Sequence, residues 1–252
     1  MKTIGLIGGM SWESTMPYYQ AINQATRAQL GGLHSAKIIL YSVDFHEIEQ
    51  LQSAGQWEAA GALLAKVAQT LEKAGADVLV LCTNTMHKVA SAIEAVVQIP
   101  LLHIADPTAA AIQQGGYHTV GLLGTRFTME QDFYRERLQR QGLRVLTPNP
   151  EDRALVHRVI YEELCLGQVL PASREAYLRV IHDLTAQGAQ AIILGCTEIA
   201  LLVEQQHCEV PLFDTTRLHA RSAVQWALEG CKIPAIALAD QEETTRSNNP
   251  SH

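Results

Sequence analysis

The stretch Gly75-Ala-Asp-Val-Leu-Val-Leu-Cys82-Thr-Asn84 decides the fold, because it returns later in the chain as Gly188-Ala-Gln-Ala-Ile-Ile-Leu-Gly-Cys196-Thr-Glu198. The second copy has one additional residue, Gly195. In each copy a glycine precedes a short apolar run, which is typical of a strand buried on both faces of a sheet, and a Cys-Thr pair follows. This recurrence indicates that the chain holds two copies of one structural unit.

Two further recurrences support the duplication. Thr3-Ile-Gly-Leu-Ile-Gly8 returns as Thr119-Val-Gly-Leu-Leu-Gly124, and Ile99-Pro-Leu-Leu102 returns as Val210-Pro-Leu-Phe213. All three matches occur in the same order and at nearly constant spacing, which chance does not readily produce.

Helical patterns lie between the expected strands. Residues 57–74 and 173–186 place apolar side chains at helical spacing, and Gly75 and Gly188 follow as plausible helix ends. Alternating strands and helices predict parallel sheets with helices on both faces. We therefore expect an α/β fold of two pseudo-symmetric open-sheet domains, over 1–112 and 113–208, with the active site in the cleft between them. The polar tail 239–252 lacks apolar periodicity and is expected to be disordered.

The composition is typical of a folded protein without a membrane-spanning segment. Of 252 residues, 47% are hydrophobic and 18% are charged, and the formal net charge is −7. That balance argues against a nucleic-acid partner, which needs a basic face, and no apolar run reaches the roughly 18 residues of a membrane helix. The five cysteines include no C-x-x-C pair, as expected in a reducing compartment. We expect a cytoplasmic protein with no membrane partner.

Polar residues gather at the expected carboxyl ends of the strands, where open α/β sheets bind ligands. The glycines Gly5, Gly8 and Gly9 do not match a nucleotide-binding pattern, although their loop could bring backbone N–H groups to a small carboxylate. The histidines lack H-x-H or H-x-x-x-H spacing, so we expect no metal site. The strand ends supply these candidate ligand-binding residues: Met10, Ser11, Thr83, Asn84, Thr85, Gly124, Thr125, Thr197 and Glu198.

Cys82 and Cys196 are the candidate catalytic residues. Each follows a buried strand and precedes a polar residue that could cap a helix, and a helix N-terminus lowers the pKa of a thiol. Two buried structural cysteines are the alternative, but that explanation leaves the repeated Cys-Thr pair unaccounted for. His87 could tune the Cys82 thiol or be an ordinary core histidine. His103, Asp106 and Asp214 follow strands and could support the site or simply stabilise turns.

Paired thiols suit one reaction in particular. Inverting a carbon centre through a planar carbanion requires a proton to leave one face and another to arrive on the opposite face. A duplicated domain with one thiol in each copy supplies a base for each face. Hydroxyl, amide and helix N-terminal donors could hold the substrate carboxylate as charge spreads onto it.

The motifs at 5–15 (GLIGGMSWEST), 82–88 (CTNTMHK) and 195–199 (GCTEI) resemble those of the aspartate/glutamate racemase superfamily. The resemblance extends to about Leu228 and is closest to the broad-specificity amino-acid racemase branch of the aspartate racemase family. It implies two-base proton transfer at an amino-acid α-carbon by Cys82 and Cys196, without a cofactor. It also implies a homodimer, and the return of residues 209–230 to the first domain.

The same resemblance implies roles for residues of the pocket. Met10, Thr83, Asn84, Thr85 and Thr197 map to carboxylate-binding positions, and Gln52 matches a substrate-contacting position of the branch. Aspartate-specific members carry an Arg near Gln52 and a Lys at the end of the Tyr-Glu-x-x-Lys stretch. Here that stretch is Tyr161-Glu-Glu-Leu-Cys165, so Cys165 is expected at the substrate and neither cation is evident.

Three alternatives remain open from the sequence. Maleate isomerase and hydantoin racemase share the superfamily fold and thiol positions. A non-catalytic amino-acid-binding protein whose paired thiols sense redox state is the third.

Overall fold

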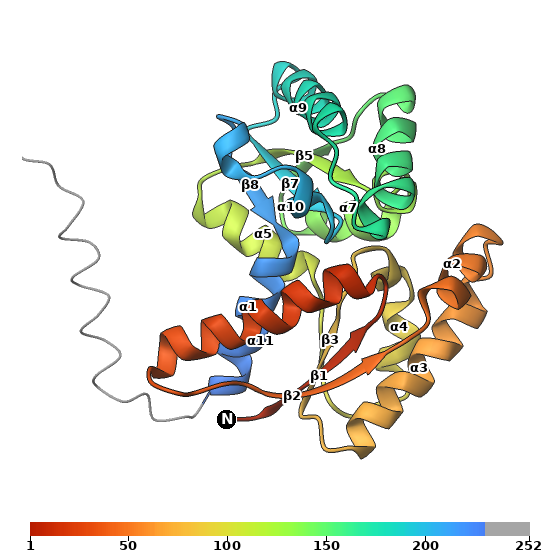
Figure 1. Cartoon of the computed structure of the whole chain (residues 1–252), viewed down its shortest axis with the longest axis vertical. Helices are drawn as coiled ribbons and strands as arrows, with labels where there is room; N and C mark the ends of the chain where they lie inside the picture. The colour runs from red at the N-terminus through yellow and green to blue at the C-terminus, as the bar shows by residue number, and fades with distance from the viewer. Residues whose placement is uncertain (230–252) are drawn as a thin grey trace, which may run out of the picture.

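Two four-stranded parallel sheets form the structure, and each is built from one copy of the repeat (Figure 1). The computed structural model describes residues 1–229. The strand orders are β2-β1-β3-β4 and β6-β5-β7-β8, and every pairing is parallel. The predicted duplicated α/β fold is therefore confirmed. The strands are β1 (Thr3–Gly8), β2 (Lys37–Ser42), β3 (Val78–Leu81), β4 (Leu101–Leu102), β5 (Thr119–Gly124), β6 (Arg144–Leu146), β7 (Ala191–Gly195) and β8 (Leu212–Asp214).

Helices cover both faces of each sheet. They are α1 (Trp12–Leu30), α2 (Phe45–Ser53), α3 (Trp57–Lys73), α4 (Ala90–Glu94), α5 (Ala105–Gln114), α6 (Arg126–Glu130), α7 (Asp132–Arg140), α8 (Pro150–Glu162), α9 (Pro171–Ala186), α10 (Ile199–Leu202) and α11 (Thr215–Leu228). Short 3-10 helices lie at η1 (Thr85–Val89), η2 (Leu164–Leu166) and η3 (Gln205–His207). The predicted helices over 57–74 and 173–186 correspond to α3 and α9.

Local sequence sets several of these helix ends. Gly75 and Gly188 follow α3 and α9 with φ of 98° and 102°, a backbone conformation that glycine adopts without steric cost. Asn149 is the N-cap residue just before α8, and its side chain accepts a hydrogen bond from the Asp152 N–H at 2.9 Å. Asp214 caps α11 in the same way, accepting from the Thr216 N–H at 2.9 Å.

The last helix of each repeat packs on the sheet of the other repeat. Helix α5 follows β4 of the first sheet, yet Ala109 and Ile112 are buried against the second sheet with Val120 and Ile193. Helix α11 follows β8 of the second sheet, yet Val224 and its neighbours pack on the first sheet with α1. Figure 1 shows α11 running alongside α1. The two domains thus exchange equivalent helices.

This exchange differs from the expected boundaries. Helix α5 lies largely within the range 1–112 expected for the first domain, and its apolar face covers the second sheet. Strand β8 lies within 209–230, expected to return to the first domain, but it pairs with β7 in the second sheet. Each strand stays with its own repeat, and only the helix after it crosses over. The tail predicted over 239–252 lies outside the described residues.

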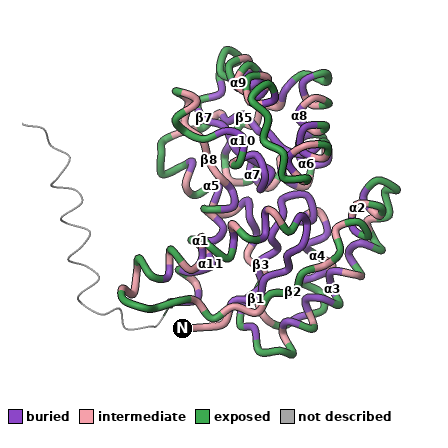
Figure 2. Tube along the Cα trace, in the orientation of Figure 1, coloured by how far each residue is buried: buried purple, intermediate pink, exposed green. Residues whose placement is uncertain are grey.

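The burial pattern places the core along the central strands (Figure 2). Strand β3 is fully buried, as is β7, whereas the edge strand β2 is largely exposed. The continuous apolar runs that predicted buried strands are thus the central strands of the two sheets. Their carboxyl ends therefore emerge from the buried centre of each domain.

Gly9 allows the chain to turn tightly after β1. Its φ is +91°, and a Cβ there would lie 2.6 Å from the backbone nitrogen of Val43 and even closer to the Val43 carbonyl oxygen. Both neighbours are backbone atoms, so they cannot move aside without displacing the chain after β2. The loop that carries Met10 and Ser11 therefore depends on glycine at this position.

We predict that Gly9→Ala lowers the free energy of unfolding by about 2 kcal/mol or more, because backbone strain and a backbone clash add. Gly116→Ala is the matched control, since Gly116 has φ +75° but nothing within 4 Å of its added Cβ, and should cost about 1 kcal/mol. Urea unfolding of both variants measures the difference. Equal losses would contradict the clash.

Candidate active site

A small pocket lies between the two domains at the carboxyl ends of the central strands. The space between its lining atoms is about 330 Å³, a figure that includes the part open to solvent. Both repeats contribute to it through the loops after β1, β3, β5 and β7. Its lining residues are Met10, Phe45, Gln52, Thr83, Asn84, Thr85, Thr125, Ile160, Tyr161, Cys165, Gly195, Cys196, Thr197 and Glu198.

Cys196 and Glu198 form the chemical centre of this pocket. The Cys196 Sγ donates to Glu198 Oε2 at 3.0 Å, and the two side chains are 8% and 2% exposed. Burial raises the pKa of the Cys196 thiol, and the nearby Glu198 carboxylate raises it further. At rest the pair therefore keeps its proton on sulfur, beside an acceptor positioned to take it.

Glu198 also joins the two domains. Its Oε1 accepts from the Ser11 hydroxyl of the first domain at 2.8 Å, and its Oε2 accepts from Thr197 Oγ1 at 2.7 Å. The Cys165 Sγ lies 3.7 Å from Oε1. Burial, together with Glu198, raises the pKa of the Cys165 thiol as well. A single buried carboxylate is thus flanked by two thiols and two hydroxyls.

Cys82 does not line the pocket. Its side chain is fully buried in the core between the first sheet and helices α1 and α11, and its Sγ lies 3.8 Å from the Val80 carbonyl oxygen. Burial raises the pKa of this thiol too. Its neighbour Thr83 does line the pocket, so Cys82 is one residue behind the surface that it was predicted to form.

The additional residue Gly195 explains why the two cysteines differ. Leu81 pairs with Ile7, and the equivalent Leu194 pairs with Leu123, so the two repeats are in the same register up to that point. Cys82 follows at once, whereas Gly195 intervenes before Cys196. Since successive side chains of a strand point to opposite faces, one additional residue turns Cys196 to the other face and moves it farther past the sheet.

Hydroxyl and amide groups line the wall formed by the first domain. Thr85 Oγ1 lies 2.8 Å from Thr125 Oγ1 of the second domain, and Asn84 Nδ2 donates to Thr215 Oγ1 at 3.0 Å. The Asn84 Oδ1 is buried and has no hydrogen-bond partner among residues 1–229. A buried acceptor facing a pocket is suited to an incoming N–H or ammonium donor.

The opposite end of the pocket is neutral and partly aromatic. Tyr161 of α8 donates to Gln52 Oε1 of α2 at 3.0 Å, and the Tyr161 and Phe45 rings stack with centroids 6.2 Å apart. These contacts bridge the two domains over the pocket. Among the described lining residues Glu198 carries the only formal charge, and none is Lys, Arg or His.

Most of the predicted site residues meet in this pocket. Three do not line it: Cys82 lies in the core, Ser11 contacts Glu198 from behind, and Gly124 lies where β5 and β7 approach closely, since a Cβ there would be 2.8 Å from the Gly195 carbonyl. Phe45 and Ile160 also line the pocket, and no sequence signal pointed to either. Tyr161 and Gly195 line it too, although the motifs that contain them did not assign either to the pocket.

Residues 1–229 contain no candidate for a membrane-spanning helix or a metal site. In this part of the chain no helix is long and apolar enough to cross a membrane. Within the same residues no group of three or more His, Cys, Asp or Glu side chains is arranged to hold a metal ion.

Comparison with known proteins defines the class. A model of the Asp/Glu/Hydantoin racemase family matches residues 7–223. A crystal structure from Yersinia pestis, assigned to the Asp/Glu racemases, has 63% sequence identity and a TM-score of 0.84, covering 90% of this chain and all of that one. An aspartate racemase homologue from Pyrococcus horikoshii has 35% identity and a TM-score of 0.78, covering 90% and 99%. This chain therefore belongs to the Asp/Glu/Hydantoin racemase family.

A relative with a named activity lies at greater distance. The broad specificity amino-acid racemase RacX of Bacillus subtilis is 23% identical over 242 residues, which cover 88% of this chain and 96% of RacX. The family predicted from the sequence motifs is thus confirmed.

We predict that Glu198→Gln shifts the alkylation of Cys196 to lower pH, by about one pH unit or more. Removing the adjacent negative charge makes the thiolate easier to form. Iodoacetamide labelling across pH, read peptide by peptide by mass spectrometry, measures the midpoint. Cys208 serves as an internal control, because the pKa of its thiol is raised by burial alone. An unchanged Cys196 midpoint would show that Glu198 does not govern this thiol.

Proposed function

We propose that this protein is an amino-acid racemase that needs no cofactor and transfers protons with Cys196 and Cys82. The observation that carries the proposal is the Cys196–Glu198 pair, with Sγ and Oε2 3.0 Å apart in a pocket built by both domains. The family membership supports the reaction class. The homodimer implied by the sequence motifs stays a prediction.

The thiol–carboxylate pair can supply a base without external help. A thiolate and a carboxylate this close repel each other, so the pair favours holding one proton between them. When Glu198 takes the proton, the neutral acid no longer opposes the Cys196 thiolate. An amino-acid ammonium group close to the Cys196 sulfur would favour the same change, because a positive charge stabilises the thiolate. Substrate binding would thereby activate the base.

Proton transfer then follows in balanced steps. The Cys196 thiolate removes the α-proton and becomes a thiol, leaving a carbanion whose charge spreads into the substrate carboxylate. Donors from Thr83, Thr85 and Thr197 stabilise that charge. The Cys82 thiol gives its proton to the opposite face and becomes a thiolate. The other enantiomer uses the same steps in reverse.

Cys82 must turn from the core toward the pocket for this scheme to operate. The next residue, Thr83, already lines the pocket, so the scheme calls for a rearrangement where the loop after β3 begins. Thr83, Asn84 and Thr85 contact groups of the second domain or the pocket itself, so a substrate that engages them acts directly on the backbone beside Cys82.

The neutral end of the pocket favours uncharged substrate side chains. We predict that amino acids such as methionine, serine and leucine are racemised with kcat/KM at least equal to that of aspartate. A second carboxylate would be buried beside Gln52, Phe45 and Tyr161 without a cation, at a cost of several kcal/mol. A chiral chromatography assay over a panel of amino acids measures the ratios.

Gln52→Arg should raise the rate with aspartate relative to neutral amino acids, as measured on the same panel. Gln52→Met is the uncharged control. Racemisation of aspartate alone by the unmodified protein would refute the assignment of substrate class. It would mean that a cation reaches the pocket from another part of the molecule.

Substitution of either thiol tests the two-base reaction. We predict that Cys82→Ser and Cys196→Ser each lower racemisation in both directions by about a hundredfold or more, because removing one positioned acid/base typically costs that much. Each variant should still exchange the α-proton of one enantiomer in deuterated water, and the two variants should prefer opposite enantiomers.

Cys208→Ser is the control for loss of a thiol outside the pocket, and it should racemise at nearly the unmodified rate. Near-normal racemisation by Cys82→Ser would show that its buried position in the core is its only role. Activity on maleate or a hydantoin, with none on free amino acids, would favour another reaction of the family.

A further inference from the structure

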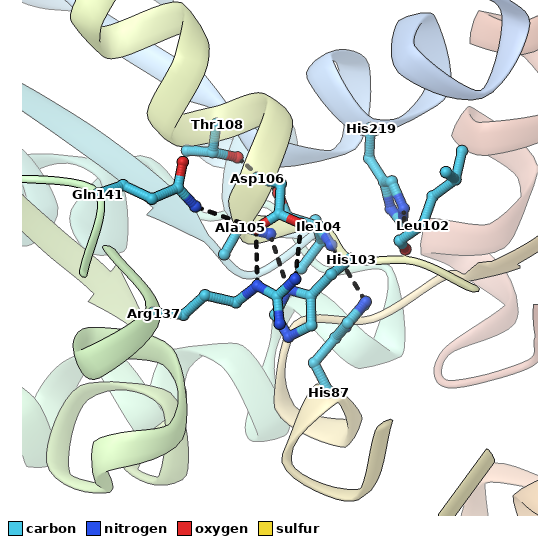
Figure 3. Close-up of polar contacts among 10 residues, drawn as sticks. All are labelled: His87, Leu102, His103, Ile104, Ala105, Asp106, Thr108, Arg137, Gln141 and His219. Atoms are coloured by element: carbon cyan, nitrogen blue, oxygen red, sulfur yellow. Dashed lines mark hydrogen bonds and ion pairs between the residues drawn. The ribbon is translucent and has the colours of Figure 1, made fainter. Parts of the chain in front are cut away.

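Three buried histidines from elements far apart in the sequence lie close together beside the loop Thr83–Thr85, which lines the pocket (Figure 3). His87 lies on η1, His103 follows β4, and His219 lies on the exchanged helix α11; each is at most 6% exposed. The centroid of the His87 ring is 4.4 Å from that of His103 and 5.8 Å from that of His219. None of the three lines the pocket, so the chemistry proposed above leaves them unused.

The neighbours of His87 determine its protonation state. Its Nδ1 lies 2.7 Å from the Thr83 carbonyl oxygen, which can only accept, so Nδ1 must carry the hydrogen. Its Nε2 accepts from the Ile104 N–H at 3.2 Å, so this nitrogen must be unprotonated. Burial, followed by the nearby His103, lowers the pKa of His87. His87 is therefore a neutral ring with its hydrogen on Nδ1.

The two bonds of His87 connect the pocket loop to the second domain. Thr83 begins the loop Thr83–Thr85, all of which lines the pocket. Ile104 directly precedes α5, whose residue Asp106 accepts two hydrogen bonds from Arg137 of α7, both at 2.6 Å (Figure 3). The ring thus fastens the loop to a helix that is itself anchored on the second sheet.

We infer that His87 is a positioning residue, which holds the loop Thr83–Thr85 in place for substrate by donating to the Thr83 carbonyl. The inference rests on the proposed function for its kinetic test, although the loop geometry can be tested separately. Its Nδ1 contacts the loop that lines the pocket, and its Nε2 contacts Ile104, just before the helix α5 that packs on the second sheet. The two contacts should therefore contribute unequally to substrate binding.

His219 supplies a matched comparison. Its Nε2 lies 2.8 Å from the Leu102 carbonyl oxygen and its Nδ1 lies 3.0 Å from the Tyr18 hydroxyl, so it too is a buried ring with two partners. Its backbone partner belongs to β4 and not to the pocket loop. Loss of that bond should affect stability without reaching the substrate.

Two substitutions separate the contacts of His87. The amide of His87→Asn can occupy the place of Nδ1 and keep the Thr83 bond, whereas that of His87→Gln can occupy the place of Nε2 and keep the Ile104 bond. We expect His87→Gln to raise KM for a neutral amino acid about tenfold, and His87→Asn to stay within about threefold of the unmodified protein. His219→Asn should lower the melting temperature while leaving KM unchanged.

Hydrogen exchange distinguishes failure of this inference from failure of the proposed function. Amides of residues 83–87 should exchange faster in His87→Gln than in His87→Asn, whether or not the protein racemises anything. Equal exchange and equal KM in the two variants would overturn the positioning role, as would an equal rise of KM in His219→Asn. If neither His87 variant folds, nitrogen NMR of the unmodified protein decides, because a His87 ring protonated on Nε2 contradicts the inference.

Discussion

The exchange of helices α5 and α11 is the constraint on which the rest of the structure depends. Each sheet has one face covered by a helix that follows a strand of the other sheet, so neither repeat can complete its core alone. The apolar burial that stabilises one domain therefore also fixes the position of the other. A pocket that takes residues from both domains is held by this shared core, and its geometry does not rely on surface contacts alone.

Within that frame the pocket combines one buried charge with neutral surroundings. Glu198 accepts hydrogen bonds from both domains, and the thiols beside it are kept protonated by burial and by its charge. Under the proposed function, such a site stays inactive until a positive group arrives to offset the carboxylate. The bridging contact between Tyr161 and Gln52 closes the other end without adding charge. The proposed function therefore assigns reactivity to the Glu198 end of the pocket and selectivity to the Gln52 end.

The repeated motifs were sufficient to predict the two sheets, because continuous apolar runs and their flanking glycines are local signals. The strand ends also identified most of the pocket, since the carboxyl ends of parallel strands meet. The residue pattern alone could not predict the helix exchange, because an amphipathic pattern shows that a face is buried and not which sheet buries it. Only the family resemblance indicated one half of it, the return of 209–230, and nothing indicated the crossing of α5. Phe45 and Tyr161 reach the pocket through the packing of α2 and α8, which no local pattern encodes. Prediction of the position of Cys82 would have required the strand register of both repeats, although the additional Gly195 is visible in the sequence.

That additional residue makes the two repeats unlike each other, with one thiol lining the pocket and the other in the core. Mirror-image amino acids have equal free energies in water. An enzyme that interconverts them must therefore have the same kcat/KM in both directions, however different its two faces are. In such a racemase, unequal thiols can make kcat differ between the two enantiomers, but KM must then differ between them by the same factor. The additional residue in the second repeat would then be visible as different KM values for the two enantiomers, and never as a difference in kcat/KM.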